Sequence, residues 1–193
     1  MNREGIIQRF EESADVKRRF VQASILQIEV LAQAVVTAFR NEKKVLFFGN
    51  GGSAADAAHL AAEFVGRYQK KRAPLPALAL TTNLSTLTSI ANDYEFADIF
   101  AHQIQAHGQT GDIAIALSTS GNSPNVLRGV DVARSKGLVT IGWTGESGGA
   151  LARHVEHAFL VPSLVTARIQ ECHMTLGHVL CELVEEELFA EIP

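Results

Sequence analysis

The chain has 193 residues, of which 47% are hydrophobic and 20% are charged, and its formal net charge at pH 7 is -4. This length and apolar content are enough for one domain with a substantial core. The negative net charge provides no basic field, so neither nucleic acid nor an anionic membrane surface is expected as a partner. An anionic substrate must therefore be held by local groups.

The cysteines and the N-terminus indicate the compartment. Cys172 and Cys181 lie nine residues apart in one predicted helix. Their Cα atoms are then about 13 Å apart along the axis, which is too far for a disulfide. Residues 1–10 lack the apolar core of a signal peptide, and no apolar run reaches the length of about 18 residues that a membrane span needs. We expect a cytoplasmic protein without a targeting or anchoring segment.

The first 41 residues form a predicted helical extension. Apolar residues recur at spacings of three and four from residue 7 to residue 40, which is typical of an amphipathic helix. Asp15 is a candidate N-cap that would divide a short first helix from a longer second one. Helices ahead of a first strand often pack on a neighbouring subunit, so we expect this extension to contribute to an oligomer.

Residues 42–193 alternate short apolar runs with helical patterns. The predicted strands are 44–48, 77–80, 113–117, 139–143 and 159–161. The predicted helices are 54–68, 84–91, 96–107, 124–136 and 149–153. A long last helix is predicted over about 164–188, with Ser163 as its candidate N-cap and an acidic end. Strands so continuously apolar are buried on both faces. The pattern predicts a single α/β domain over 1–193: a three-layer αβα sandwich with a five-stranded parallel sheet.

A glycine turn, Gly49-Asn50-Gly51-Gly52-Ser53, follows the first predicted strand and opens a helix. Free backbone N–H groups and the positive end of a helix dipole meet there, so a phosphate or sugar oxygen can bind. The turn lacks the G-x-G-x-x-G pattern of dinucleotide sites, and Thr81-Thr82 stand where the acidic ribose partner would be. We therefore expect neither a nicotinamide nor a flavin cofactor.

A second candidate phosphate loop, Ser118-Thr119-Ser120-Gly121-Asn122-Ser123, follows the third strand. Its four hydroxyls and its backbone donors can hold a phosphate without lysine or arginine. The alternative is an ordinary strand-to-helix turn with Ser123 as N-cap and Pro124 at the first helical position. The glycine turn after the first strand favours phosphate binding, because the carboxyl ends of parallel strands share one ligand crevice.

Polar residues on two helices are candidates for acid-base or metal chemistry. His59 and Glu63 are four residues apart, so they share one helix face next to the glycine turn. A surface ion pair is the alternative. Gln170 and His178 on the last helix are about 12 Å apart along the axis and roughly 80 degrees around it, so their spacing does not by itself indicate a metal site. For His173 we favour a packed or subunit-contact role.

Asn92-Asp93 has two interpretations. It can cap the helix that begins near Phe96. It can also bind a sugar hydroxyl.

The ordered set of motifs resembles the phosphoheptose isomerases, which have the sugar-isomerase (SIS) fold. The motifs are Gly49-Asn50-Gly51-Gly52-Ser53, His59, Glu63, Gly66-Arg67-Tyr68, Asn92-Asp93, Ser118-Thr119-Ser120-Gly121-Asn122-Ser123, and Arg168-Ile169-Gln170-Glu171 with His178. The resemblance runs from about residue 45 to residue 183. It implies a cytoplasmic homotetramer that interconverts sedoheptulose 7-phosphate and D-glycero-D-manno-heptose 7-phosphate. That reaction is the entry step to the ADP- or GDP-heptose precursors of lipopolysaccharide or another surface polysaccharide.

The resemblance also assigns site residues. It implies one zinc ion per subunit, held by His59, Glu63, Gln170 and His178. It implies substrate contacts from Asn50, Gly51, Gly52, Ser53, Glu63, Asn92, Asp93, Ser118, Thr119, Ser120, Ser123 and Gln170. Moving a carbonyl from C2 to C1 through an enediol needs a base and an acid, for which Glu63 and His178 are the candidates. Which of them takes the proton first stays open.

Two other functions are compatible with the fold. The SIS family contains a non-enzymatic protein that associates with the bacterial replication initiator, and residues 167–171 and 187–189 are similar to that group. Against it, this chain has both Glu63 and His178, whereas the regulatory relative lacks the acid and the second histidine. The other is a sugar-phosphate-sensing regulator, which would bind the ligand without turnover.

Overall fold

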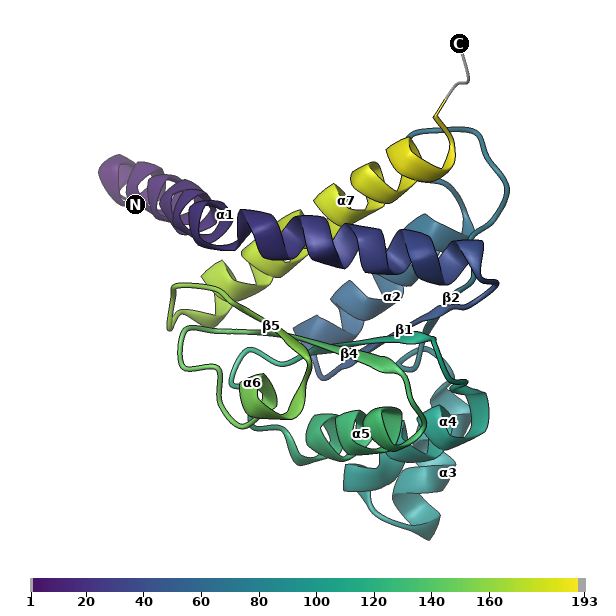
Figure 1. The fold of residues 1–193 in the computed structure, drawn as a ribbon. Coiled ribbons are helices and arrows are strands. Elements are labelled where there is room, and N and C mark those ends of the chain that lie inside the picture. The colour runs from purple at the N-terminus through teal and green to yellow at the C-terminus, as the bar shows by residue number, and fades with distance from the viewer. Residues whose placement is uncertain (1, 191–193) are drawn as a thin grey trace.

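The computed structural model describes residues 2–190, and its centre is a five-stranded parallel sheet in the order β2-β1-β3-β4-β5 (Figure 1). The strands are β1 Val45–Gly49, β2 Ala77–Ala79, β3 Ile113–Leu117, β4 Val139–Thr144 and β5 His157–Leu160. All five predicted strands and their parallel arrangement are confirmed. The order reverses after β2, because the chain returns past β1 to form β3, and ligands of such sheets bind at this switch point.

Helices cover both faces of the sheet, as predicted. The helices α1, α2 and α7 lie on one face and α3 to α6 lie on the other (Figure 1). Their bounds are α1 Arg3–Arg40, α2 Gly52–Val65, α3 Leu84–Asp93, α4 Ile99–His107, α5 Pro124–Ser135, α6 Leu151–His154 and α7 Thr166–Leu188, with a 3-10 turn η1 at Phe96–Asp98. In β1, Val45 and Phe47 enter the core under α1, α2 and α7, while Leu46 and Phe48 enter the opposite core. This alternation explains why the strands are apolar throughout.

The N-terminal extension is one helix of 38 residues, so the predicted division at Asp15 is wrong. The Asp15 carboxylate accepts hydrogen bonds from Arg18 Nη2 at 2.7 Å and Arg19 Nε at 2.9 Å. These partners lie three and four residues ahead, a spacing that stabilises a continuous helix. Asn2 is the N-cap instead, since its side chain accepts from the N–H of Glu4.

The helix α1 is long and apolar enough, by length and composition, to cross a membrane, which the sequence pattern did not indicate. Such evidence is weak for one helix, because the core helix of a soluble protein passes the same test. From Val16 onward the inward face of α1 packs into the core with α7. Its N-terminal part projects beyond the rest of the molecule (Figure 1) and exposes Ile7 and Phe10, and Leu26 is exposed further along.

Two predicted caps are wrong. The helix α7 begins at Thr166, and the hydroxyl of Ser163 accepts from the N–H of Val165 in the turn that precedes the helix. Asn92 and Asp93 end α3 instead of opening the next helix, and the Asn92 amide donates to the Asp93 carboxylate. In both cases the side chain makes a hydrogen bond to a residue one or two positions away and not to the start of the next helix. Short polar residues often favour turns for this reason.

The helices α2 and α7 pack closely side by side. A Cβ atom placed on Gly177 of α7 would collide with Leu60 of α2, a side chain that is fully buried. Glycine at this point therefore sets the distance between the two helices. Cys172 and Cys181, on the same helix, are unbridged, as predicted, and both are buried.

We expect Gly177→Ala to lower the free energy of unfolding by about 1–3 kcal/mol, because the added methyl group overpacks the contact between α2 and α7. Urea denaturation followed by circular dichroism measures the change. The matched control is Gly5→Ala in α1, whose Cβ would meet only side-chain atoms of Arg9 and Asn2. That change should raise stability by up to about 1 kcal/mol, since alanine favours helix over glycine. Equal effects of the two substitutions would contradict the packing argument.

Candidate active site

The glycine turn connects β1 to α2 at the carboxyl edge of the sheet. Gly51 is the N-cap of α2 and has φ +56°, a left-handed conformation that favours glycine. A Cβ atom on the next residue, Gly52, would overlap the side-chain amide of Gln170 from α7. The absence of side chains here leaves the backbone of the helix start open to a ligand, with the Gln170 amide directly beside it.

The hydroxyl loop follows β3 at the same edge. Ser123 is the N-cap residue of α5 with Pro124 in the first turn, as predicted. However, the Ser123 hydroxyl makes no capping hydrogen bond and lies 3.3 Å from the hydroxyl of Ser118. Gly121 has φ +65°, and its close packing against Gly148 fixes the loop. The two hydroxyls therefore lie side by side near the start of a helix, where both can turn to donate to one anion.

A pair of asparagines joins the glycine turn to the helix that follows the hydroxyl loop. The Asn50 amide donates to Asn125 Oδ1 and the Asn125 amide donates to Asn50 Oδ1, both at 2.8 Å. Asn125 is 2% exposed and also accepts from the N–H of Val126. Asn125 was not among the residues expected from the sequence, and its place in the first turn of α5 is the one local signal of a polar contact there. The Asn50 side chain is therefore held in place by Asn125.

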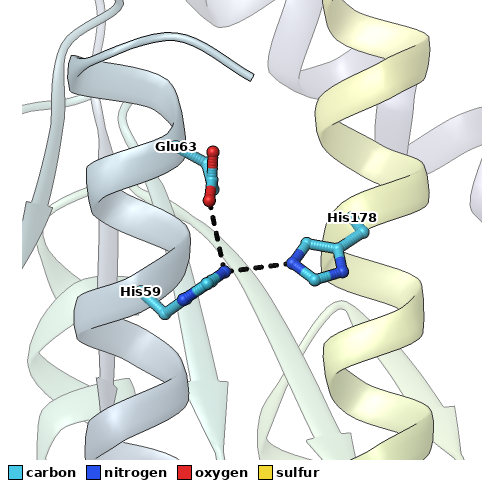
Figure 2. Close-up of side chains that lie close together, drawn as sticks. All are labelled: His59, Glu63 and His178. Atoms are coloured by element: carbon cyan, nitrogen blue, oxygen red, sulfur yellow. Dashed lines mark hydrogen bonds and ion pairs between the residues drawn. The ribbon is translucent and has the colours of Figure 1, made fainter. Parts of the chain in front are cut away.

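Three side chains from two helices converge beyond the glycine turn. Figure 2 shows His59 and Glu63 on α2 opposite His178 on α7. His59 Nε2 lies 3.0 Å from His178 Nε2 and 3.2 Å from Glu63 Oε1. One ligand atom from each of the three residues lies within 4.8 Å of the others. The sequence could place His59 and Glu63 together, but only the fold brings His178 to them.

The donor set of this triad suits zinc. Two imidazole nitrogens and one carboxylate oxygen are ligands that Zn²⁺ takes at about 2.0–2.2 Å. Two Nε2 atoms face each other, so a proton or a cation must lie between their lone pairs. Gln170, the fourth expected ligand, is two turns away from His178 on α7 and lies against Gly52. The structure therefore groups three of the expected ligands, and the Gln170 amide lies beside the glycine turn.

Two small cavities border these loops. One of about 190 Å³ is lined by residues of the glycine turn together with Thr81 and Phe96. Another of about 190 Å³ is lined by Thr119, Ser120 and Ser163 beside the hydroxyl loop. A larger cavity of about 810 Å³ lies under α1 at the opposite edge of the sheet and contains none of the expected site residues. The chemistry of the lining, and not the volume, therefore locates the candidate site.

Other expected residues lie further out. Asn92 and Asp93 are exposed at the end of α3, and among residues 2–190 no hydrogen bond joins them to the loops described above. His173 is fully buried, and its Nε2 lies 3.3 Å from the carbonyl of Thr144. Burial lowers its pKa to about 4, so it is a neutral packed histidine, as favoured from the sequence.

Comparisons with known proteins define the class. The profile of the SIS domain family matches residues 8–145. Two solved phosphoheptose isomerases are similar in structure, one from Neisseria gonorrhoeae with a TM-score of 0.89 at 38% identity and one from Francisella tularensis with 0.91 at 36%. Each comparison covers 95% of this chain, and it covers 98% and 97% of the respective solved chains. The domain is thus a SIS domain.

Curated sequences narrow the class further. The chain is 56% identical over 177 residues to a phosphoheptose isomerase of Aquifex aeolicus, covering 92% of this chain and 93% of the relative. It is 57% identical over 158 residues to one of Rhodospirillum rubrum, covering 81% and 84%. The chain belongs to the phosphoheptose isomerases of the SIS domain family.

Proposed function

We propose that this chain is an aldose-ketose isomerase that converts sedoheptulose 7-phosphate to D-glycero-D-manno-heptose 7-phosphate. Its relatives are phosphoheptose isomerases over nearly their full length. The observation that carries the proposal is the convergence of a carboxylate and two imidazoles, from Glu63, His59 and His178, beside a turn suited to a sugar phosphate. A non-enzymatic role with the replication initiator is not favoured, because the relatives reported above are isomerases.

The phosphate is held without lysine or arginine. We assign it to the hydroxyls and backbone N–H groups of the hydroxyl loop and to the helix start after the glycine turn. The proposed substrate contacts are Asn50, Gly51, Gly52, Ser53, Glu63, Asn92, Asp93, Ser118, Thr119, Ser120, Ser123 and Gln170. The paired Asn50 and Asn125 amides hold the two binding segments at a fixed separation.

The reaction transfers a proton between two neighbouring carbons. A base removes a proton from C1 of the ketose while an acid protonates the C2 oxygen, which gives the enediol. Removal of the C1 hydroxyl proton and protonation of C2 then give the aldose. Glu63 and His178 are the proposed acid-base pair, because a carboxylate and an imidazole supply a base and an acid near neutral pH. They come from separate helices, which supports a base and an acid that approach the sugar from different elements.

The proposed cofactor is one zinc ion per subunit, with His59, Glu63, Gln170 and His178 as ligands. When bound, zinc supplies Lewis-acid polarisation of the carbonyl oxygen. The support is the nature and spacing of the triad's donor atoms. Gln170 is included because of the family resemblance. Its side chain lies beside Gly52, a proposed substrate contact, so it is also proposed to contact the substrate.

We expect Glu63→Gln and His178→Gln to lower kcat by about 10²- to 10⁴-fold, since each removes a proton-transfer group. NMR detection of the aldose formed from sedoheptulose 7-phosphate measures turnover, and thermal unfolding checks that the variants are folded. The matched control is His107→Gln, an exposed histidine at the end of α4 that should leave turnover unchanged. Binding of the sugar phosphate without turnover by the wild-type protein would instead indicate a sensing regulator.

Removal of the metal tests the cofactor. We expect the purified protein to contain about one zinc per subunit and to lose activity after dialysis against a chelator, with recovery on adding zinc. Elemental analysis of wild type and His59→Ala measures the content. Gln170→Ala separates two roles, because loss of a ligand lowers zinc affinity whereas loss of a substrate contact raises KM alone. Full activity of zinc-free protein would eliminate the metal from the proposal.

We also propose that the protein is a cytoplasmic homotetramer that serves the synthesis of a heptose-containing surface polysaccharide and binds neither nucleic acid nor membrane. The support for assembly is the exposed apolar surface of α1, where Ile7, Phe10 and Leu26 are more than half exposed in the single chain. Large apolar side chains left exposed in a single chain are typical of surfaces that a partner covers.

Light scattering at micromolar concentration is expected to give about four times the subunit mass of 20.9 kDa, because the apolar face of α1 is covered only on assembly. Phe10→Glu should shift the population towards smaller species. The matched control is Glu11→Gln on the same exposed helix, which adds no charge to the apolar face. A monomer of the wild-type protein would overturn the tetramer.

A further inference from the structure

Glu185 is a buried carboxylate that organises the loop after α2. It is 2% exposed, and it accepts hydrogen bonds from the backbone N–H groups of Tyr68, Gln69 and Lys70, each at 2.9 Å. Arg72 Nε donates to it at 2.7 Å. Burial alone would raise the pKa of the Glu185 carboxyl, but these N–H groups and the Arg72 guanidinium lower it to about 2. The group is therefore ionised at neutral pH and fully partnered, as a buried charge must be.

Arg72 connects this carboxylate to the end of α2. Its Nη2 donates to the backbone carbonyl of Glu63 at 2.9 Å, and its Nη1 donates to that of Phe64 at 2.8 Å. The guanidinium is thus shared between α7, through Glu185, and the last turn of α2. Its side chain is 1% exposed, so water does not compete for these contacts. Arg72 therefore links the backbone that carries Glu63 to α7.

Tyr68 connects the same carboxylate to His178, the other member of the proposed acid-base pair. Its ring stacks on the His178 imidazole, with centroids 5.6 Å apart and an interplanar angle of 28°. Its backbone N–H is one of the donors to Glu185, which lies seven residues, or about two turns, after His178 on α7. Glu185 thus holds the backbone of the residue whose ring lies over His178.

We infer that Glu185 is a positioning residue for the acid-base and metal triad, acting through Tyr68 on His178 and through Arg72 on Glu63. The inference rests on the proposed function of the triad. The three triad residues come from two helices, and neither helix alone fixes the distance between His59 and His178. A buried ionic clamp at the end of both helices supplies that constraint. Supporting contacts of this kind are commonly needed for the ligands of a metal to keep their geometry.

A purely structural clamp is the competing explanation, and the chain contains a matched control for it. Asp112 is also fully buried, accepts from two backbone N–H groups, those of Lys44 and Gln109, and pairs with Lys44 Nζ at 2.6 Å. It lies just before β3, at the edge of the sheet opposite the site. Asp112→Asn removes a comparable buried charge without touching α2 or α7.

The experiment compares Glu185→Gln with Asp112→Asn in the full-length protein. Turnover by the wild-type protein tests the proposed function separately. For folded Glu185→Gln we expect kcat and zinc affinity each to fall by about 10- to 100-fold, with KM within about threefold of wild type. Zinc affinity is measured on metal-free protein by competition with a chromogenic chelator. Loss of the ring-current shift of the His178 ring protons in NMR reports directly on the Tyr68 stack. Asp112→Asn should lower the unfolding temperature but leave kcat, zinc affinity and the histidine signals unchanged.

A second variant keeps the test decisive if Glu185→Gln does not fold. Tyr68→Leu retains the backbone donor and the Arg72 clamp but removes the ring, and we expect about a tenfold loss of kcat with the same change in the His178 signals. Wild-type kcat and zinc affinity in the folded variants would overturn the inference. So would equal losses in Asp112→Asn, because the effect would then follow stability alone. Inactive wild-type protein would instead refute the proposed function.

Discussion

The separation of α2 and α7 is the constraint on which the site depends. A zinc ligand set or an acid-base pair needs donor atoms within a few ångströms, yet His59 and His178 are 119 residues apart in the chain. Two contacts set the separation: glycine at position 177 lets Leu60 approach, and Arg72 joins Glu185 to the last turn of α2. One contact is apolar and close-packed, and the other is ionic. Together they fix both the distance between the helices and their register.

The phosphate end of the site follows a different principle, because its proposed donors are uncharged. Hydroxyls of Ser118 and Ser123 and the start of α2 present partial positive charge at fixed positions. A lysine would supply a stronger field but also a flexible chain that loses entropy on binding. The net charge of -4 gives no long-range attraction for an anionic sugar. Selection must therefore come from geometry, which the rigid Asn50–Asn125 pair maintains.

Local patterns predicted the layers of the fold but not the contacts that cross them. The strands could be predicted because each residue of a doubly buried strand meets a core, whichever face it enters. His59 and Glu63 could be paired because four residues make one helical turn. Glu185, by contrast, belongs in sequence to an acidic helix end and looks solvated, but the fold buries it under the loop after α2. Asp15 failed as a cap because arginines compete for its carboxylate.

The same side chains are proposed to hold zinc and to move protons, and the two roles require different atoms. A lone pair that binds a metal cannot accept a proton at the same time. Glu63 offers two oxygens, and only Oε1 faces His59 (Figure 2). In the proposed mechanism its second oxygen stays free to exchange a proton with the substrate. The His178 imidazole faces the triad through Nε2, so the Tyr68 stack that fixes its plane also fixes where its other nitrogen lies. Orientation of these two side chains, more than their presence, decides whether the carbonyl end of the sugar can react.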